Sequence, residues 1–186
     1  MVDCGIPLIN KYMTVEEVKS IIRTVSDFPK EGILFRDLTT AFNNPECLHW
    51  FGERLFEYYK DLGVTKVLGV ESRGFIVAPI VADKLGAGFV PVRKKGKLPA
   101  DVITESYEKE YGVDTIEIHK DALSENDVVM IHDDLLATGG TMLAAINLVK
   151  KFNVKKIYIS FLVELDVLNG RQTLGGGVDV YSLVHY

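Results

Sequence analysis

A segment that joins an apolar strand to a helix carries the residues best suited to chemistry. Asp133 and Asp134 follow the apolar run 127–131, and Ala137-Thr138-Gly139-Gly140-Thr141 opens a helix expected over residues 140–152. Backbone N–H groups at a helix N-terminus bind anions, and glycine lets a ligand approach the backbone closely. Carboxylates next to such a turn can accept hydrogen bonds from a sugar diol. The segment therefore favours a ribose 5-phosphate; it lacks the lysine of a Walker A loop and is not a GxGxxG motif.

Two further segments that follow strands are suited to anions. Glu71-Ser72-Arg73 lies between the apolar strand 66–70 and a helix expected over 74–85, and the forked guanidinium of Arg73 matches a pyrophosphate. The run 93–99 holds four cations within its first five residues: Arg93, Lys94, Lys95 and Lys97. A charge run is usually just a solvated surface. Because this one directly follows a strand in an acidic protein, a polyanionic ligand is the better interpretation.

Residues 94–114 are polar and read as one long loop. Such loops inside a compact domain are usually functional or mobile. With Tyr107 and Tyr111 this one could form a flexible lid that excludes water. An exposed linker would have the same composition.

Strands that alternate with helices must position these segments. A capping box of Thr14 and Glu17 predicts a helix to about Val25, and helical spacing of apolar residues predicts another from Pro45 to Leu62. Strands are expected at 34–39, 66–70, 89–93, 115–119, 127–131, 156–164 and 178–184, with Pro91 favouring an edge or a bulge. This order predicts a single α/β domain over residues 1–186, with a mostly parallel sheet covered by helices on both faces. Ligands of such sheets bind at the C-terminal ends of the strands.

The composition excludes several classes of protein. Of the 186 residues 47% are hydrophobic, which is typical of a globular chain, and the pI of about 5.4 disfavours bulk nucleic-acid binding. No apolar run approaches a membrane span of about 18 residues, and no signal peptide is readable. Cys4 and Cys47 are expected to be free thiols of a reducing compartment, which predicts a cytoplasmic protein. The four histidines have no zinc-site spacing.

Six segments, in this order, resemble the type I phosphoribosyltransferases and, more closely, the adenine phosphoribosyltransferase family. They are FPKEGILFRD (28–37), ESRGF (71–75), RKKGKLP (93–99), SYEKEYG (106–112), DDLLATGGT (133–141) and FLVEL…GR (161–171). The resemblance implies that adenine and 5-phosphoribosyl 1-diphosphate give AMP and diphosphate, with Mg²⁺ carried by the diphosphate substrate. It also implies a homodimer, with no protein metal ligand.

The resemblance also implies roles for individual residues. Residues 137–141 would bind the 5′-phosphate, and Asp133 and Asp134 the ribose. Glu110 and Arg73 would be catalytic, Glu110 as the acid/base on the purine. The diphosphate would lie against Glu71, Ser72, Arg73, Arg93 and Lys97. Residues 1–40 would contain a hood in which Leu34, Phe35 and Arg36, together with Leu135, contact adenine; Tyr107 and Tyr111 would belong to the lid.

Three alternatives remain at this stage. The chain could use another base, such as hypoxanthine or orotate; it could be a nucleotide-sensing regulator that keeps the fold; or it could be a generic doubly wound binding module. His132 departs from the family pattern, where an apolar or acidic residue is expected. Its ring could be charged by the neighbouring acids, or it could be a buried, neutral strand residue.

Overall fold

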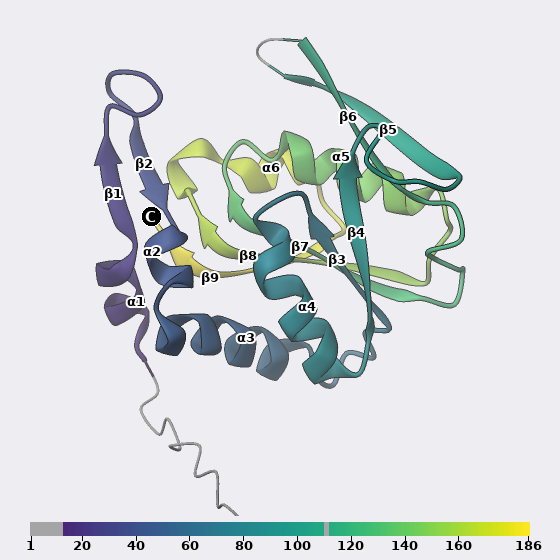
Figure 1. Ribbon diagram of the computed structural model, residues 1–186, viewed down its shortest axis with the longest axis horizontal. Coiled ribbons are helices and arrows are strands. Elements are labelled where there is room, and N and C mark those ends of the chain that lie inside the picture. Colours follow the sequence, from purple (N-terminus) through teal and green to yellow (C-terminus); the bar gives the residue numbers. More distant parts are fainter. Residues whose placement is uncertain (1–12, 110–111) are drawn as a thin grey trace, which may run out of the picture. The chain divides into compact units, whose positions relative to one another are not determined.

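The protein is described by a computed structural model that covers residues 13–109 and 112–186. The chain divides into two compact units, residues 1–50 and 51–186, the first described from residue 13. The segment expected to form the hood lies in the first unit, and all strands of the main sheet lie in the second (Figure 1).

The first unit contains two short helices and a two-stranded sheet. Helix α1 (Val15–Ile21) begins with the expected capping box, in which Thr14 and Glu17 exchange hydrogen bonds. The expected continuation to Val25 is wrong, because the chain turns after α1 into strand β1 (Arg23–Ser26). This strand pairs antiparallel with β2 (Leu34–Asp37), and an ion pair joins Arg23 to Asp37. Helix α2 (Thr39–Phe42) follows, and α3 (Pro45–Tyr59) continues into the second unit.

The second unit has a seven-stranded sheet in the order β5-β6-β4-β3-β7-β8-β9. Strands β3 (Lys66–Val70), β4 (Gly88–Lys94), β7 (Val128–Leu136), β8 (Lys156–Glu164) and β9 (Asp179–His185) are parallel. Strands β5 (Val102–Lys109) and β6 (Gly112–His119) are antiparallel additions at one edge. The expectation of a mostly parallel sheet is therefore confirmed.

Helices cover both faces of this sheet. Helix α4 (Gly74–Leu85) lies on one face and α5 (Gly140–Lys150) on the other (Figure 1). The core under α5 is built from Val and Ile residues of β3, β4, β6, β7 and β8 together with Ile146 and Val149 of the helix. On the other face, α3 packs against α4, where Glu53 forms an ion pair with Lys84. The short elements Asp166–Leu168 (3₁₀) and α6 (Gly170–Leu174) follow β8. Among the described residues, no helix has the length and apolar character needed to cross a bilayer.

The long loop expected at residues 94–114 is instead largely a β-hairpin. Strands β5 and β6 pair from Val102↔His119 to Lys109↔Gly112. The hairpin forms because the buried Ile116 and Ile118 of β6 add to the core, and Lys151 holds Glu105 of β5 at 2.6 Å. Of the described residues in this range, only 95–101, between β4 and β5, lie outside strands.

Pro91 lies in β4 where one side of that strand has no partner. It pairs with Gly69 of β3 on the other side, while β6 pairs only with Arg93 and Lys94. A proline lacks the N–H that a second neighbour would need. The expected edge is wrong, because β4 is an inner strand of the sheet, but Pro91 lies outside the stretch that pairs with β6.

Candidate active site

The glycine turn (Ala137–Thr141) connects β7 to α5 and forms one wall of the site. Gly139 has a φ of +87°, a left-handed conformation that glycine adopts without strain, and it is the N-cap of α5. No side chain caps this helix, so its first N–H groups need another partner. The start of an 11-residue helix is thus left with donors suited to an anion.

Two other glycines let neighbouring segments approach this wall. A Cβ on Gly170 would lie 2.3 Å from the carbonyl oxygen of Ala137, so α6 can support the glycine turn only because residue 170 has no side chain. A Cβ on Gly74 would lie 2.7 Å from the carbonyl oxygen of His132. That close contact lets α4 begin beside the end of β7, which brings Arg73 to the acidic pair.

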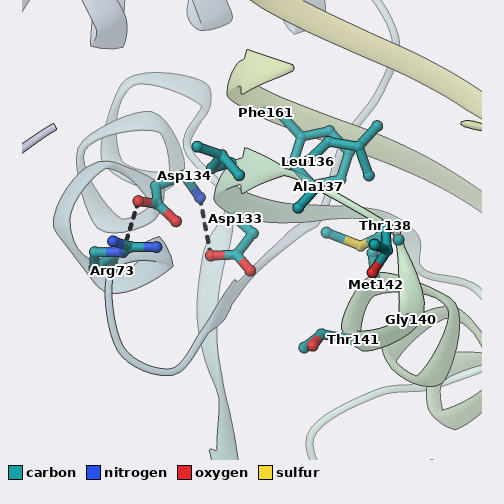
Figure 2. Close-up of a pocket in the computed structure, with 12 residues that line it drawn as sticks. Arg73, Asp133, Asp134, Leu136, Ala137, Thr138, Gly140, Thr141, Met142 and Phe161 are labelled. Carbon is teal, nitrogen blue, oxygen red and sulfur yellow. Dashed lines mark hydrogen bonds and ion pairs between the residues drawn. The ribbon is translucent and has the colours of Figure 1, made fainter. Parts of the chain in front are cut away.

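Asp133, Asp134 and Arg73 meet in a cavity of about 220 Å³ (Figure 2). The Nε atom of Arg73 lies 2.7 Å from Oδ2 of the buried Asp134, and the backbone N–H of Asp134 donates to Oδ1 of Asp133 at 2.9 Å. The described residues that line the cavity are Arg73, Asp133, Asp134, Leu135, Leu136, Ala137, Thr138, Gly139, Gly140, Thr141, Met142 and Phe161. The residues expected to bind the ribose and the 5′-phosphate therefore line the same cavity as Arg73.

The acidic pair is electrostatically strained without a ligand. Burial raises the pKa of Asp133 well above its ordinary value, and the charge of Asp134 raises it further. Burial also raises the pKa of Asp134, although the Arg73 guanidinium opposes that shift. A ligand that donates hydrogen bonds to these carboxylates would relieve this cost.

Glu71, Ser72 and Arg93 lie at the ends of β3 and β4 but do not line the cavity. Oε2 of Glu71 accepts from Arg93 Nε at 3.0 Å and from the Lys94 N–H at 2.8 Å. Burial alone would raise the pKa of Glu71, but these two donors outweigh it and lower that pKa. The Glu71–Ser72 peptide bond is cis. Glu71 thus holds Arg93, whose guanidinium carbon also lies 5.8 Å from the ring centre of Phe75.

The remaining lid and loop residues are only partly described. The Thr141 hydroxyl donates to Tyr107 Oη at 3.2 Å, which joins the hairpin to the glycine turn. Glu110 and Tyr111 lie outside the described residues. The side chain of Lys97 is exposed, and its backbone N–H donates to Glu117.

The candidate adenine contacts are divided between the two units. Leu135 lines the cavity, whereas Leu34, Phe35 and Arg36 belong to β2 of the first unit. Phe35 packs edge-to-face against Phe28, with ring centres 5.1 Å apart, and the Arg36 side chain donates to Thr24.

His132 is a buried, neutral residue of β7. Its Nδ1 lies 2.7 Å from Ser160 Oγ of β8, and its side chain is 0% exposed. Burial lowers the pKa of His132 to about 3. The expectation of a buried strand residue is therefore confirmed, and a charged ring beside the acids is not supported.

Sequence reasoning did not assign a role to the residues that support the glycine turn. Arg171 of α6 donates twice to Glu164 of β8, at 2.7 Å each, and the Ser182 hydroxyl donates to the same carboxylate at 2.6 Å. This network fixes the start of α6, where Gly170 contacts the turn. The pair Gly170-Arg171 was visible only as part of a family motif; its structural role depends on contacts between separate strands.

Comparison with known proteins agrees with this geometry. A glycine turn, an acidic pair and an arginine at the strand ends of a mostly parallel sheet are the arrangement expected of a phosphoribosyl-binding α/β protein. Residues 44–172 match the family described as the phosphoribosyl transferase domain. An adenine phosphoribosyltransferase of Bacteroides thetaiotaomicron is 59% identical over 172 residues, which cover 92% of this chain and 98% of that protein.

Two crystal structures extend the likeness to three dimensions. The adenine phosphoribosyltransferase of Rhodothermus marinus has a TM-score of 0.86 and 48% identity, covering 92% of this chain and 98% of the other. The enzyme of Giardia lamblia, in complex with 9-deazaadenine, has a TM-score of 0.88 and 44% identity, covering 94% and 98%. The chain belongs to the phosphoribosyltransferase family, and within it to the adenine phosphoribosyltransferases.

Proposed function

We propose that this protein transfers the 5-phosphoribosyl group of 5-phosphoribosyl 1-diphosphate to adenine and releases AMP and diphosphate. It is thus a pentosyltransferase of purine salvage. The observation that carries this proposal is the single cavity in which the glycine turn, the acidic pair and Arg73 come together. An anion site, diol acceptors and a forked cation are the three groups that phosphoribosyl diphosphate requires.

Each group has a part in the reaction. The N–H groups of the glycine turn bind the 5′-phosphate, and the Asp133 carboxylate accepts hydrogen bonds from the ribose hydroxyls. Arg73, with Arg93 and Lys97, neutralises the charge that develops on the diphosphate as the C1′–O bond breaks. Ser72 and the backbone at Glu71 complete the diphosphate site. Glu110 takes the proton that adenine loses on forming its bond to C1′.

Leu135 and the hood residues Leu34, Phe35 and Arg36 contact adenine. Main-chain groups of the hood read the edge of the base, and the Phe35 ring packs on it. Tyr107 of the hairpin, together with Tyr111, excludes water during the reaction.

The donor groups of the cavity suit Mg²⁺ carried by the substrate. Magnesium prefers oxygen ligands and is commonly held by one or two carboxylates plus substrate phosphates, which the Asp133 carboxylate allows. The one cluster of three candidate metal ligands found among the described residues, Glu164, Asp166 and His185, is not part of the cavity lining. When bound, the ion withdraws charge from the departing diphosphate.

We further propose that the protein is a homodimer of the cytoplasm, as implied by its family. A dimer would sediment with twice the mass of the 20.7 kDa chain. A monomer at micromolar concentration would contradict this part of the proposal.

The activity is tested by incubating the protein with phosphoribosyl diphosphate, Mg²⁺ and, separately, adenine, hypoxanthine, guanine or orotate. We expect AMP from adenine and little nucleotide from the other bases. Preferred use of another base would overturn the adenine assignment, and no product from any base would favour a binding protein without catalysis.

A further inference from the structure

A buried carboxylate outside the cavity holds the basic loop in one conformation. Glu117 of β6 is only 3% exposed, and its Oε1 accepts from the Lys97 N–H at 2.9 Å and from the Leu98 N–H at 3.0 Å. The basic loop is defined here as residues 93–98. It carries the four cations Arg93, Lys94, Lys95 and Lys97.

The loop backbone is wrapped around this carboxylate. Lys95 N–H donates to the Thr115 carbonyl at 3.1 Å, and Lys97 N–H also approaches the Lys94 carbonyl at 3.3 Å. Gly96 has a φ of +80°, a left-handed conformation that directs successive N–H groups to the same side. Such a nest of N–H groups commonly binds an anion, and in this protein Glu117 is that anion.

The ionisation of Glu117 agrees with this geometry. Burial alone would raise its pKa, but hydrogen bonds from the backbone of Gly96, Leu98 and Lys97 outweigh burial and lower it, and Arg93 lowers it further. The carboxylate is therefore charged at neutral pH.

The consequence concerns how the loop can contact a ligand. Since Glu117 occupies the backbone donors of the nest, the loop can offer an anionic ligand only its cationic side chains. Lys94, Lys95 and Lys97 are all exposed. Glu71 anchors the start of the same loop through Arg93 and the Lys94 N–H. Two carboxylates thus fix the loop backbone at both ends while its lysines remain free to face solvent or ligand.

We propose that Glu117 is a positioning residue that presents the cations of the basic loop to the diphosphate group of the substrate. The proposal rests on the proposed function. It does not place Glu117 in contact with any substrate atom.

The test compares Glu117→Ala with Glu117→Gln by steady-state kinetics. Alanine removes the acceptor, so we expect the KM for phosphoribosyl diphosphate to rise by about tenfold or more, equivalent to about 1.4 kcal/mol of binding free energy. The KM for adenine and kcat should change much less. Glutamine keeps a carbonyl acceptor of the same size and should restore most of the loss. A merely structural role would lower the active fraction, hence kcat, at unchanged KM.

Direct binding provides the second readout. AMP carries no diphosphate, so calorimetry should give unchanged AMP affinity for Glu117→Ala together with weaker binding of Mg²⁺-diphosphate. Asp127→Ala is the matched control, because the buried Asp127 likewise accepts a backbone N–H, that of Ser124 at 2.7 Å, but precedes β7 at the opposite end of the strand from the cavity. It should leave both affinities unchanged.

A second variant keeps the proposal testable if Glu117→Ala does not fold. A Cβ on Gly96 would meet nothing within 4 Å, so Gly96→Ala disturbs only the left-handed backbone of the nest. It should raise the KM for phosphoribosyl diphosphate in the same selective way. Unchanged KM and diphosphate affinity in folded Glu117→Ala and Gly96→Ala would overturn the inference. A wild-type protein that forms no AMP but binds diphosphate would instead overturn the proposed function alone.

Discussion

In the proposed function, Asp133 and Asp134 serve binding at the expense of stability. They are adjacent in sequence, yet Asp134 forms an ion pair with Arg73 at 2.7 Å, while the part of the chain that the structure describes gives Asp133 no such pair. Asp133 lines the cavity with its pKa raised by burial and by its neighbour. Such a group is costly in the free protein because its charge is poorly solvated. A ligand that donates hydrogen bonds to the Asp133 carboxylate would offset this cost.

We therefore predict opposite effects of Asp133→Asn on stability and activity. The unliganded variant should have the same or a higher melting temperature, because the repulsion between the carboxylates is removed. The KM for phosphoribosyl diphosphate should rise about tenfold or more, since hydrogen bonds to charged groups contribute about 1.5–3 kcal/mol. Calorimetric melting and steady-state kinetics measure the two effects. Asp134→Asn differs because it leaves Arg73 unpaired, so it should lower both stability and activity; unchanged kinetics in both variants would remove the acids from the site.

His132 makes the stability of the protein dependent on acid. Its ordinary pKa is 6.5, whereas burial lowers the pKa to about 3 in the folded protein. Below pH 6.5 the unfolded chain binds a proton that the folded protein does not. The contribution of neutral His132 to the free energy of unfolding is therefore fully present above pH 6.5. It is lost as the pH falls toward 3, by up to about 1.4 kcal/mol per pH unit.

The corresponding prediction concerns His132→Val. Denaturant unfolding of this variant between about pH 6 and pH 4 should show a shallower fall of stability than the wild-type protein. Its pH–rate profile near neutrality should superimpose on that of the wild type, because the wild-type ring is already neutral. The exposed His49 supplies the control His49→Val, which should keep the wild-type slope. Equal slopes for all three proteins would contradict the burial argument.

At the scale of elements, the β5–β6 hairpin contacts the glycine turn. Lys151 of the segment after α5 holds Thr104 and Glu105, and Tyr107 meets the hydroxyl of Thr141 farther along the same strand. The hairpin is thus fixed near its base and in contact with the glycine turn at Tyr107. The acid/base residue that the family resemblance implies, Glu110, follows β5 in the sequence.

Tyr107→Phe should loosen this connection. The variant removes the acceptor of the Thr141 hydroxyl and the longer bond from Tyr107 Oη to Asp114 Oδ2 at 3.5 Å. A hydrogen bond contributes about 0.5–1.5 kcal/mol, so we expect a few-fold lower kcat/KM for phosphoribosyl diphosphate. Hydrogen exchange of residues 102–109 should become faster. Tyr58→Phe, on an exposed ring of α3, provides the control. Identical exchange in wild type and Tyr107→Phe would show that the contact does not hold the hairpin.

Variants of Glu110 and Glu108 distinguish a specific acid/base role of Glu110 from a general effect of losing one negative charge. With the proposed acid/base role of Glu110, Glu110→Ala should lower kcat by about 10²-fold or more with little change in ground-state binding, because proton transfer contributes only in the transition state. Glu108 is an exposed residue of β5 and Glu108→Ala should stay near wild type. Kinetics with adenine varied at saturating phosphoribosyl diphosphate decide between them. If Glu108→Ala is the impaired enzyme, the acid/base role belongs to that residue instead.

The whole molecule combines an acidic surface with a basic site. Its formal net charge is −5, yet four cations lie within residues 93–97 and Arg73 borders the cavity. A net negative protein repels a polyanionic substrate at long range, so the concentrated local charge must supply the attraction. That attraction is subject to screening by salt.

Salt should therefore distinguish the two substrates. Raising the ionic strength from about 0.05 M to 0.5 M shortens the Debye length severalfold. The kcat/KM for phosphoribosyl diphosphate should fall, while that for the uncharged adenine should change little. Lys95→Ala should reduce the salt dependence of kcat/KM for phosphoribosyl diphosphate without affecting kcat/KM for adenine. A parallel fall for both substrates would indicate a general effect of salt on the protein.

The sequence by itself determined the elements that depend on neighbouring residues. The capping box at Thr14, the strand before Asp133 and the glycine turn before α5 all follow from local hydrogen bonding and apolar patterning. The alternation of strands and helices was enough to predict the sheet and the end of it at which ligands bind. The family resemblance added the base and the order of roles, but no contacts.

Only the tertiary structure decided which distant residues meet. Residues 115–119 were expected as a strand and lie in β6, but the rest of the hairpin was expected as a loop. The polar strand β5 gains stability mainly from pairing with β6 and packing on α5. Glu117 gave no signal, since a glutamate on an alternating strand is usually exposed, and its burial depends on a turn 19 to 20 residues away. The close approaches at Gly74 and Gly170 likewise depend on backbones from separate elements. Local propensity acts over a few residues, whereas these contacts form only when the sheet brings remote segments together.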